Sequence, residues 1–329
     1  MKLAFVGKGG SGKTTLASLL ARHLAADGLP VLAIDADVNQ QLGVALGLEE
    51  AEAARLPAMG DHLEAIKDYL RGSNPRIRSA ATMVKTTPPG RGSRLLRVAE
   101  PNPLYRLLER RAGAVRLLAT GPFGTEELGV ACYHARTGAV ELLLNHLVDG
   151  PGEYVVVDMT AGADCFASGL FTRFDRTFLV VEPTRQAVAV WHQYQGYARG
   201  FGVNLSAVGN KVQTQADVAF LRQRLGADLL ACVRQSGFVR AAEQARPQPL
   251  QALEPANRAA LARLREAVDA TPQDWARFTR QAVQFHLRNA SAWANARTGE
   301  DLAAQVDPEF ALAPDAPRPA TTVWSSLPS

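Results

Sequence analysis

Glycines and lysines at a fixed spacing near the start of the chain are suited to binding phosphate. An apolar run, residues 3–6, leads into residues 7–15 (GKGGSGKTT), which match the phosphate-loop pattern G-x-x-x-x-G-K-[ST]. The glycines let the backbone curl so that successive N–H groups point at an anion, and the helix predicted to follow presents its positive end to the same anion. Lys13 would neutralise the β and γ phosphates, and the Thr14 hydroxyl would bind Mg²⁺. The expected nucleotide contacts come from Gly9, Gly10, Ser11, Gly12, Lys13, Thr14 and Thr15.

Three carboxylates follow apolar runs that are predicted to be strands. Asp35 ends the run 31–35 and Asp37 follows two residues later, and Asp158 ends the run 154–158. In a parallel sheet, such strand ends meet at the edge where ligands bind. Asp158 would hold a Mg²⁺-bound water there, and a second carboxylate would orient the attacking water. The alternative is that Asp37 only caps a helix and Asp158 only ends a strand.

A second lysine, Lys8, lies in the same loop, although a phosphate loop needs only Lys13. The form K-G-G-x-G-K-T-T resembles the deviant Walker A loop of the ParA/MinD-type ATPases. The resemblance implies that Lys8 reaches across a face-to-face homodimer, formed on ATP binding, to the nucleotide of the partner. It also implies that Asp37 positions the attacking water, whereas Asp35 is mainly structural. Val38 stands where many family members have proline, so the geometry of this loop is open.

The segment after Asp158 narrows the resemblance to one branch of that family. The sequence D-M-x-A-G at residues 158–162 resembles switch II of the nickel-insertion ATPases of carbon monoxide dehydrogenase, with Thr160 where a glutamate is frequent. This branch also resembles the nitrogenase iron protein. The resemblance covers about residues 1–268 and implies a role in the maturation of a metal centre or an enzyme.

Asn210 is the candidate for recognising the base. It follows an apolar run, and its position resembles that of the adenine-contacting residue of the family. An amide both donates and accepts hydrogen bonds, which matches the N6/N7 edge of adenine. Guanine is usually read by the aspartate of an N-K-x-D motif, and the fourth position here is Gln213. We therefore expect ATP rather than GTP.

Cysteines leave the metal chemistry open. Cys132 and Cys165 fall close to the two cysteine positions of the nitrogenase iron protein, whereas Val130 stands where the nickel-insertion ATPases have the first cysteine of C-x-C. Two cysteines per subunit on a two-fold axis would give four thiolates, the ligand set of a [4Fe–4S] cluster. Phe166 would crowd such a cluster. Two buried, unliganded thiols, a cluster and another interfacial metal are three open alternatives, and Cys232 is expected in the core.

Apolar runs alternate with helical patterns along the chain, which is typical of a parallel sheet covered by helices. This alternation predicts the strands and helices that would position the site residues. The predicted strands are 3–6, 31–35, 115–120, 154–158, 177–182, 205–210 and 229–233. The predicted helices are 16–26, 139–147, 186–199, 216–225 and 257–268. The strands are continuously apolar, as expected where helices cover both faces. We expect an α/β fold: a doubly wound, mostly parallel sheet with a C-terminal helical extension.

Composition divides the 329-residue chain into an ATPase domain (1–270), a helical extension (271–307) and a Pro/Ala-rich tail (308–329). We expect one or two amphipathic helices in the extension, and a tail that is draped over the surface or disordered. Within the first part, the segment 66–116 carries twelve lysines and arginines against three acids and should form short helices and loops. Three interpretations of this positive charge stay open: solvated surface, a site for an acidic client protein, or a site for nucleic-acid phosphate. The scarcity of aromatic residues argues against stacking on single-stranded nucleic acid.

The predicted activity is Mg²⁺-dependent ATP hydrolysis that drives dimerisation and acts on a partner protein. Two alternatives are a ParA-like positioning ATPase that binds DNA or a scaffold through residues 66–116, and a nucleotide-gated scaffold without turnover. We expect no membrane partner, because no apolar run approaches the length that spans a bilayer. Three cysteines without a C-x-x-C pair argue against a disulfide framework and suggest the cytoplasm.

Overall fold

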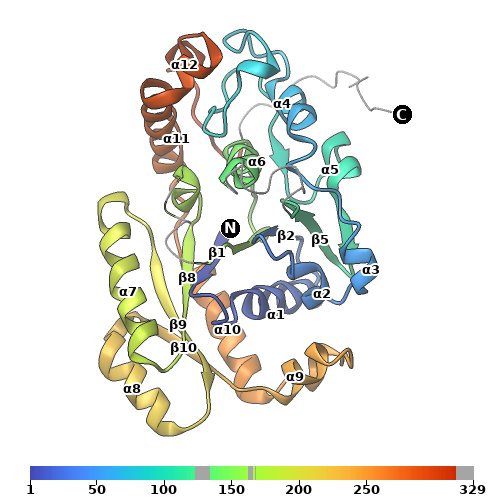
Figure 1. Ribbon diagram of the computed structural model, residues 1–329, viewed down its shortest axis with the longest axis vertical. Helices are drawn as coiled ribbons and strands as arrows, with labels where there is room; N and C mark the ends of the chain where they lie inside the picture. Colours follow the sequence, from blue (N-terminus) through green and yellow to red (C-terminus); the bar gives the residue numbers. More distant parts are fainter. Residues whose placement is uncertain (123–133, 162–165, 167, 316–329) are drawn as a thin grey trace.

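A twisted sheet of eight strands forms the centre of the protein (Figure 1). The computed structural model describes residues 1–122, 134–161, 166 and 168–315. The strand order is β10-β9-β8-β1-β7-β2-β5-β4, and every pairing is parallel except that of β4 with β5. The strands are β1 (Lys2–Gly7), β2 (Val31–Ala36), β4 (Arg110–Ala112), β5 (Val115–Ala119), β7 (Tyr154–Met159), β8 (Arg176–Val181), β9 (Leu205–Val212) and β10 (Leu229–Arg234). All seven strands predicted from apolar runs are confirmed, and the short antiparallel edge strand β4 is an addition.

Helices cover both faces of this sheet. They are α1 (Lys13–Ala26), α2 (Leu42–Leu46), α3 (Glu50–Ala53), α4 (Leu63–Arg71), α5 (Pro103–Leu108), α6 (His134–Asn145), α7 (Arg185–Ala198), α8 (Gln215–Leu225), α9 (Gly237–Glu243), α10 (Pro255–Asp269), α11 (Trp275–Asn289) and α12 (Asn295–Thr298). A second, two-stranded sheet joins β3 (Leu96–Arg97) to β6 (Leu147–Val148). The predicted doubly wound α/β fold is confirmed. No helix in the described ranges is long and apolar enough to cross a bilayer.

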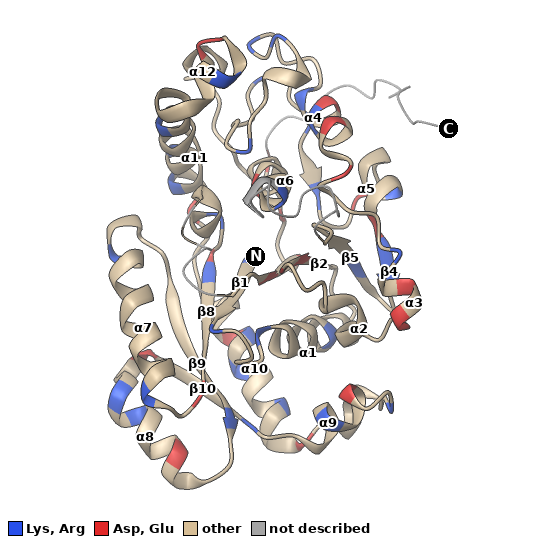
Figure 2. Ribbon diagram, viewed as in Figure 1, with Lys and Arg blue, Asp and Glu red and all other residues tan. Residues whose placement is uncertain are grey.

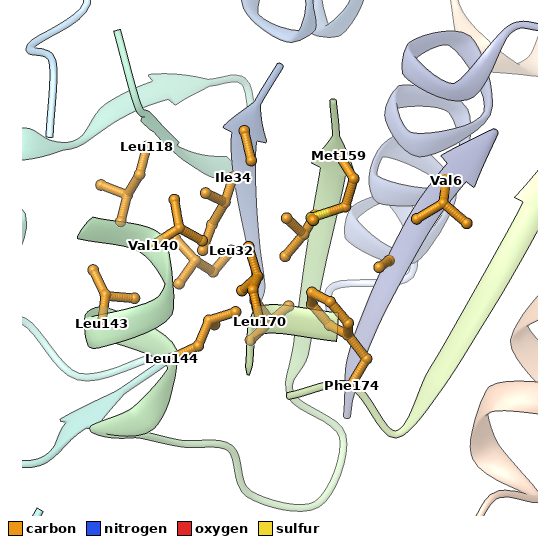
Figure 3. Close-up of a cluster of buried hydrophobic side chains, with 14 of the residues drawn as sticks. Val6, Leu32, Ile34, Leu118, Val140, Leu143, Leu144, Met159, Leu170 and Phe174 are labelled. Carbon is orange, nitrogen blue, oxygen red and sulfur yellow. The ribbon is translucent and has the colours of Figure 1, made fainter. Parts of the chain in front are cut away.

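Alternate residues of the strands supply two separate apolar layers. Leu3 and Phe5 pack with α1 and α10 on one face, and Ala4 and Val6 pack with α6 and α7 on the other. Figure 3 shows the second layer, in which side chains of β1, β2, β5 and β7 lie on the same face of the sheet as those of α6. Burial on both faces explains why the strands read as continuous apolar runs, and it holds their ends rigidly at one edge of the sheet.

The C-terminal extension, with α11 and α12, lies at one end of the molecule (Figure 1). It contacts the loops that follow α4, since His286 of α11 meets Thr86 and Glu300 lies close to Arg78. A π-helical turn, Ala290–Ala294, joins α11 to α12. Residues 302–314, called the C-terminal strap below, then run back along loops of the basic segment 66–116. Gln305 is buried there and donates to the backbone oxygen of Thr82, and the Leu312 N–H donates to the hydroxyl of Thr279 on α11. Residues 308–315 thus lie against the body, and residues 316–329 are outside the described part.

Arg76, Arg78 and Arg91 of the basic segment contact acids of this C-terminal region. Arg91 bonds Asp307 through its backbone N–H (3.1 Å) and through Nε (3.0 Å), and also contacts Glu309 at 2.8 Å. Arg78 lies 3.7 Å from Glu300. Figure 2 shows basic positions on these loops beside acidic and basic positions around α12. Residues 66–116 contain α4, a 3₁₀ turn and α5, as expected, but also the short strands β3 and β4, which are not expected from the sequence. Part of the positive charge of this segment is neutralised within the chain itself.

Candidate functional site

The phosphate loop connects the end of β1 to the start of α1. Gly12 caps α1 in a left-handed conformation (φ 95°). A Cβ on Gly12 would lie 2.2 Å from Nδ2 of Asn210, so both the backbone angle and the close approach require glycine. The first N–H groups of α1 have no partner within the helix and face the loop, as in helix termini that bind anions.

Two consecutive residues at the end of β9 hold the outer side of this loop. Asn210 Nδ2 donates to the Ser11 carbonyl oxygen at 2.8 Å, and Lys211 Nζ donates to that of Gly10 at 2.6 Å. Lys211 is itself fixed by Glu182 at 2.8 Å. Because the C=O and N–H of a trans peptide point in opposite directions, holding these carbonyls turns the next N–H groups away from β9. Contact of Asn210 with the base stays a prediction, and neither its bond to the loop nor that of Lys211 is predicted by the sequence.

The predicted magnesium residues meet beside the loop. Thr14 Oγ1 donates to Asp158 Oδ2 at 2.6 Å. Asp158 is fully buried, and its Oδ1 has no hydrogen-bond partner among the described residues. Burial raises the pKa of Asp158 to about 7, a shift that the Thr14 hydrogen bond and the charge of Lys13 partly oppose. The Thr14 hydroxyl and the buried Asp158 carboxylate offer oxygen ligands side by side, which suits a hard cation that keeps part of its water shell. These residues fit Mg²⁺ held by Thr14 directly and by Asp158 through water.

Asp35 organises the loop that carries Asp37. It lies opposite Asp158 in the β2–β7 register and accepts hydrogen bonds from the N–H groups of Asp37 (3.2 Å) and Leu42 (2.8 Å). Burial, with the nearby charge of Asp158, raises its pKa to about 8. Asp35 therefore connects the end of β2 to the start of α2, in agreement with the structural role implied by the resemblance.

Asp37 lies at the phosphate site. Its Oδ2 is 3.9 Å from Nζ of Lys13, and its Oδ1 accepts from the backbone N–H of Asn39 at 3.0 Å. Both Asp37 and Lys13 are largely buried, at 6% and 5% exposure, so their charges interact with little solvent screening. The structure thus brings Asp37, Lys13, Thr14 and Asp158 together, as the sequence predicted.

Lys8 points elsewhere. Its side chain is exposed, and Nζ donates to Gln186 Oε1 at 2.9 Å, at the first turn of α7. This position is compatible with a role toward a second subunit, which stays a prediction. Cys132 and Cys165 lie outside the described residues, so their metal chemistry also stays a prediction. Cys232 is half-buried in β10 and packs at the margin of the core. No cluster of three or more metal-binding side chains occurs within residues 1–122, 134–161, 166 and 168–315.

Comparisons with known proteins agree with this geometry. Residues 3–121 match the family model described as "CobQ/CobB/MinD/ParA nucleotide binding domain". The chain is 32% identical over 248 residues to the carbon monoxide dehydrogenase accessory protein CooC of Rhodospirillum rubrum, covering 74% of this chain and 88% of that protein. It is 29% identical to an uncharacterised ATP-binding protein of Methanocaldococcus jannaschii, covering 71% and 84%.

Solved structures share the fold at lower identity. The MinC:MinD cell division complex of Aquifex aeolicus matches with a TM-score of 0.55 and 19% identity, over 83% of this chain and 97% of that one. MinD of Pyrococcus horikoshii, solved with Mg-ADP, matches with a TM-score of 0.52 and 17% identity, over 82% and 96%.

Proposed function

Because the chain belongs to the CobQ/CobB/MinD/ParA family of nucleotide-binding proteins, we propose that it is a Mg²⁺-dependent ATPase that dimerises on ATP and acts on a partner protein. The observation that carries the proposal is the meeting of Lys13, Thr14, Asp37 and Asp158 beside the phosphate loop. These groups are what phosphoryl transfer requires, since the reaction depends on positioning and on stabilising charge.

Each residue has a distinct task in this mechanism. The loop N–H groups and Lys13 would bind the β and γ phosphates, and Thr14 with Asp158 would hold Mg²⁺, which neutralises charge on the phosphates when bound. Asp37 would orient the attacking water or accept its proton, a task helped by the fixed backbone that Asp35 provides. Lys8 would act on the nucleotide of the partner subunit.

We assign the biological role by likeness to the accessory protein of carbon monoxide dehydrogenase: the partner would be an enzyme whose metal centre is being matured. The proposal leaves three alternatives for Cys132 and Cys165, which the metal content of the protein distinguishes. They hold an interfacial [4Fe–4S] cluster, hold another metal, or are buried thiols. Asp307 of the C-terminal strap already pairs with Arg91, and Glu300, just before the strap, lies close to Arg78. Both contacts reduce the charge that the basic segment offers to an acidic client or to nucleic acid.

ATP turnover and dimerisation test the proposal directly. Purified protein should hydrolyse ATP only with Mg²⁺, and size-exclusion chromatography with light scattering should show a dimer with ATP and a monomer without nucleotide. Asp158→Asn is the informative variant, because the amide keeps the shape and can accept from Thr14 but cannot hold a metal-bound water as a carboxylate does. ATP binding without hydrolysis in the wild type would favour the nucleotide-gated scaffold instead.

A further inference from the structure

Gly169 lies at the point where three elements meet. It opens the 3₁₀ helix η4 (Gly169–Thr172), which contacts both α6 and α11. A Cβ on Gly169 would lie 2.5 Å from Oε1 of Glu141 on α6 and 3.0 Å from Cγ of Phe285 on α11. Both side chains therefore lie directly against this one glycine, a few residues after the switch II sequence.

Glu141 supplies the polar half of this junction. Its side chain is 2% exposed and accepts hydrogen bonds from the Ser168 side chain and from the N–H of Gly169. Ser168 Oγ in turn accepts from the N–H of Leu170 at 3.3 Å, so one hydroxyl joins the carboxylate to the first turn of η4. Burial raises the pKa of Glu141 to about 7, although the charges of Lys85 and Arg173 oppose the shift. The other oxygen, Oε2, is buried without a hydrogen-bond partner among the described residues, so the carboxyl is held from one side only.

Aromatic rings supply the other half. The ring of Phe285 lies 5.8 Å from that of Phe171 in an edge contact, and Phe171 lies 4.9 Å from Phe166. Phe166 also packs against Tyr194 (4.9 Å) and Tyr197 (5.2 Å) of α7. A continuous set of ring contacts thus connects α7 through η4 to the C-terminal extension.

The segment that starts at Asp158 therefore makes contacts at both of its described ends. At one end, Ala161 lies beside the phosphate loop, since a Cβ on Gly9 would be 3.9 Å from the Ala161 Cβ. At the other end, Ser168 and Gly169 are held by Glu141 and Phe285. A nucleotide that contacts the segment near Ala161 can move Gly169 only if the contacts of Gly169 differ between the nucleotide-bound and nucleotide-free protein.

We propose that Glu141 and Phe285 are positioning residues for ATP turnover, which hold the chain at Gly169, after the switch II sequence, and link it to helix α11. The proposal rests on the ATPase function proposed above. It gives the C-terminal extension a task at the nucleotide site, in addition to covering the basic segment. Neither residue touches the nucleotide, and both act through Gly169.

Four variants separate positioning from simple folding effects. Glu141→Leu removes the hydrogen-bond acceptors but keeps similar bulk, whereas Glu141→Gln keeps one acceptor oxygen for the Gly169 N–H. Phe285→Ala removes the ring that lies on Gly169. Leu287→Ala is the matched control, because Leu287 is on the same helix and is 42% exposed. Thermal unfolding of each variant verifies that it is folded.

Kinetics give the first readout. Glu141→Leu and Phe285→Ala should lower kcat about tenfold or more, the scale expected when a reacting group is misplaced, while the Kd for a fluorescent ATP analogue stays within about twofold. Glu141→Gln should recover most of kcat, and Leu287→Ala should match the wild type. Parallel losses in Kd and kcat, or no rescue by glutamine, would overturn the positioning role.

Hydrogen–deuterium exchange gives a readout that does not require hydrolysis. Mg²⁺ with the non-hydrolysable analogue AMPPNP should change amide exchange in residues 275–289 of the wild type and of Leu287→Ala, and this response should disappear in Phe285→Ala. A protein that hydrolyses ATP without any such response refutes the link to α11 and leaves the ATPase function intact. A protein that shows the response but does not hydrolyse ATP refutes the ATPase function and supports the link.

Discussion

Replacing the two loop lysines one at a time distinguishes a local role from a role across the dimer. Lys13 is 5% exposed and lies 3.9 Å from Asp37 inside the site, whereas Lys8 is exposed and bonds only Gln186 among the described residues. We expect Lys13→Ala to lose ATP binding, and Lys8→Ala to keep binding but lose turnover and ATP-dependent dimerisation.

The size of the Lys13 effect follows from the contacts that it would make. A hydrogen bond to a charged group contributes about 1.5–3 kcal/mol, so contacts to two phosphates give about 3–6 kcal/mol. This corresponds to a Kd raised about 10²- to 10⁴-fold. Because the partner of Lys8 is outside the phosphate site of its own chain, its removal should change the monomer Kd by less than about threefold, which is within a surface charge effect.

Titration with a fluorescent ATP analogue in Mg²⁺ measures Kd, and a phosphate-release assay and size-exclusion chromatography measure turnover and dimerisation. Arg280→Ala is a suitable control, since it removes one positive charge from an exposed position of α11. Equal losses of ATP affinity in Lys8→Ala and Lys13→Ala would refute the trans role. Unchanged dimerisation in Lys8→Ala would do so as well.

Three further results are expected. Asp37→Ala should accumulate an ATP-bound dimer in size-exclusion chromatography, because water attack is slowed while phosphate binding remains; wild-type turnover in this variant would show that another group does this work. Burial raises the pKa of Asp158 to about 7 and of Asp35 to about 8, so the folded, nucleotide-free protein keeps protons that the unfolded chain loses above about pH 4. This contribution to the free energy of unfolding in urea should therefore fall as pH rises from about 4 to 8, whereas burial of His146, which lowers its pKa to about 4, acts in the opposite direction. The difference between the wild type and Asp158→Asn isolates the carboxyl, and identical pH dependences of the two proteins would contradict the assignment. If Cys132 and Cys165 form a four-thiolate site, anaerobic protein should be brown with about four iron atoms per dimer, and either serine variant should lose the iron. One zinc or nickel per dimer, lost only in Cys132→Ser, would indicate the metallochaperone chemistry instead. Colourless, metal-free protein would mean that both residues are buried thiols.

The parallel sheet could be predicted because its signals are local. The run Tyr154–Met159 is continuously apolar since both of its faces are covered, and the phosphate loop has a spacing that few other structures require. The same holds for the site, because residues at the ends of adjacent parallel strands must meet. Asp35 and Asp158 are paired in register, as strand ends in one sheet should be.

Contacts between distant segments could not be predicted in this way. The sequence gives Lys211 no motif of its own, and its bond to the Gly10 carbonyl depends on how β9 ends against the loop. Glu141 reads as an ordinary helix residue, although it is buried against Gly169. The basic segment likewise is interpreted from the sequence as solvated surface, as a site for an acidic client or as a nucleic-acid site, because nothing local shows that Arg91 meets Asp307, 216 residues later. Such pairings depend on the tertiary fold and have no periodicity to reveal them.

The distance along the chain between Arg91 and Asp307 also has a consequence for biosynthesis. At about 5–20 residues per second, the ribosome adds the 216 residues between them in roughly 10–40 s. During that time the nascent chain presents the arginines of residues 76–97 without the acids of the C-terminal strap. The phosphate loop and the first strands can form early, but this end of the molecule is completed only when the last part of the chain emerges. A stalled or truncated chain would therefore expose a strongly basic surface beside an otherwise assembled nucleotide site.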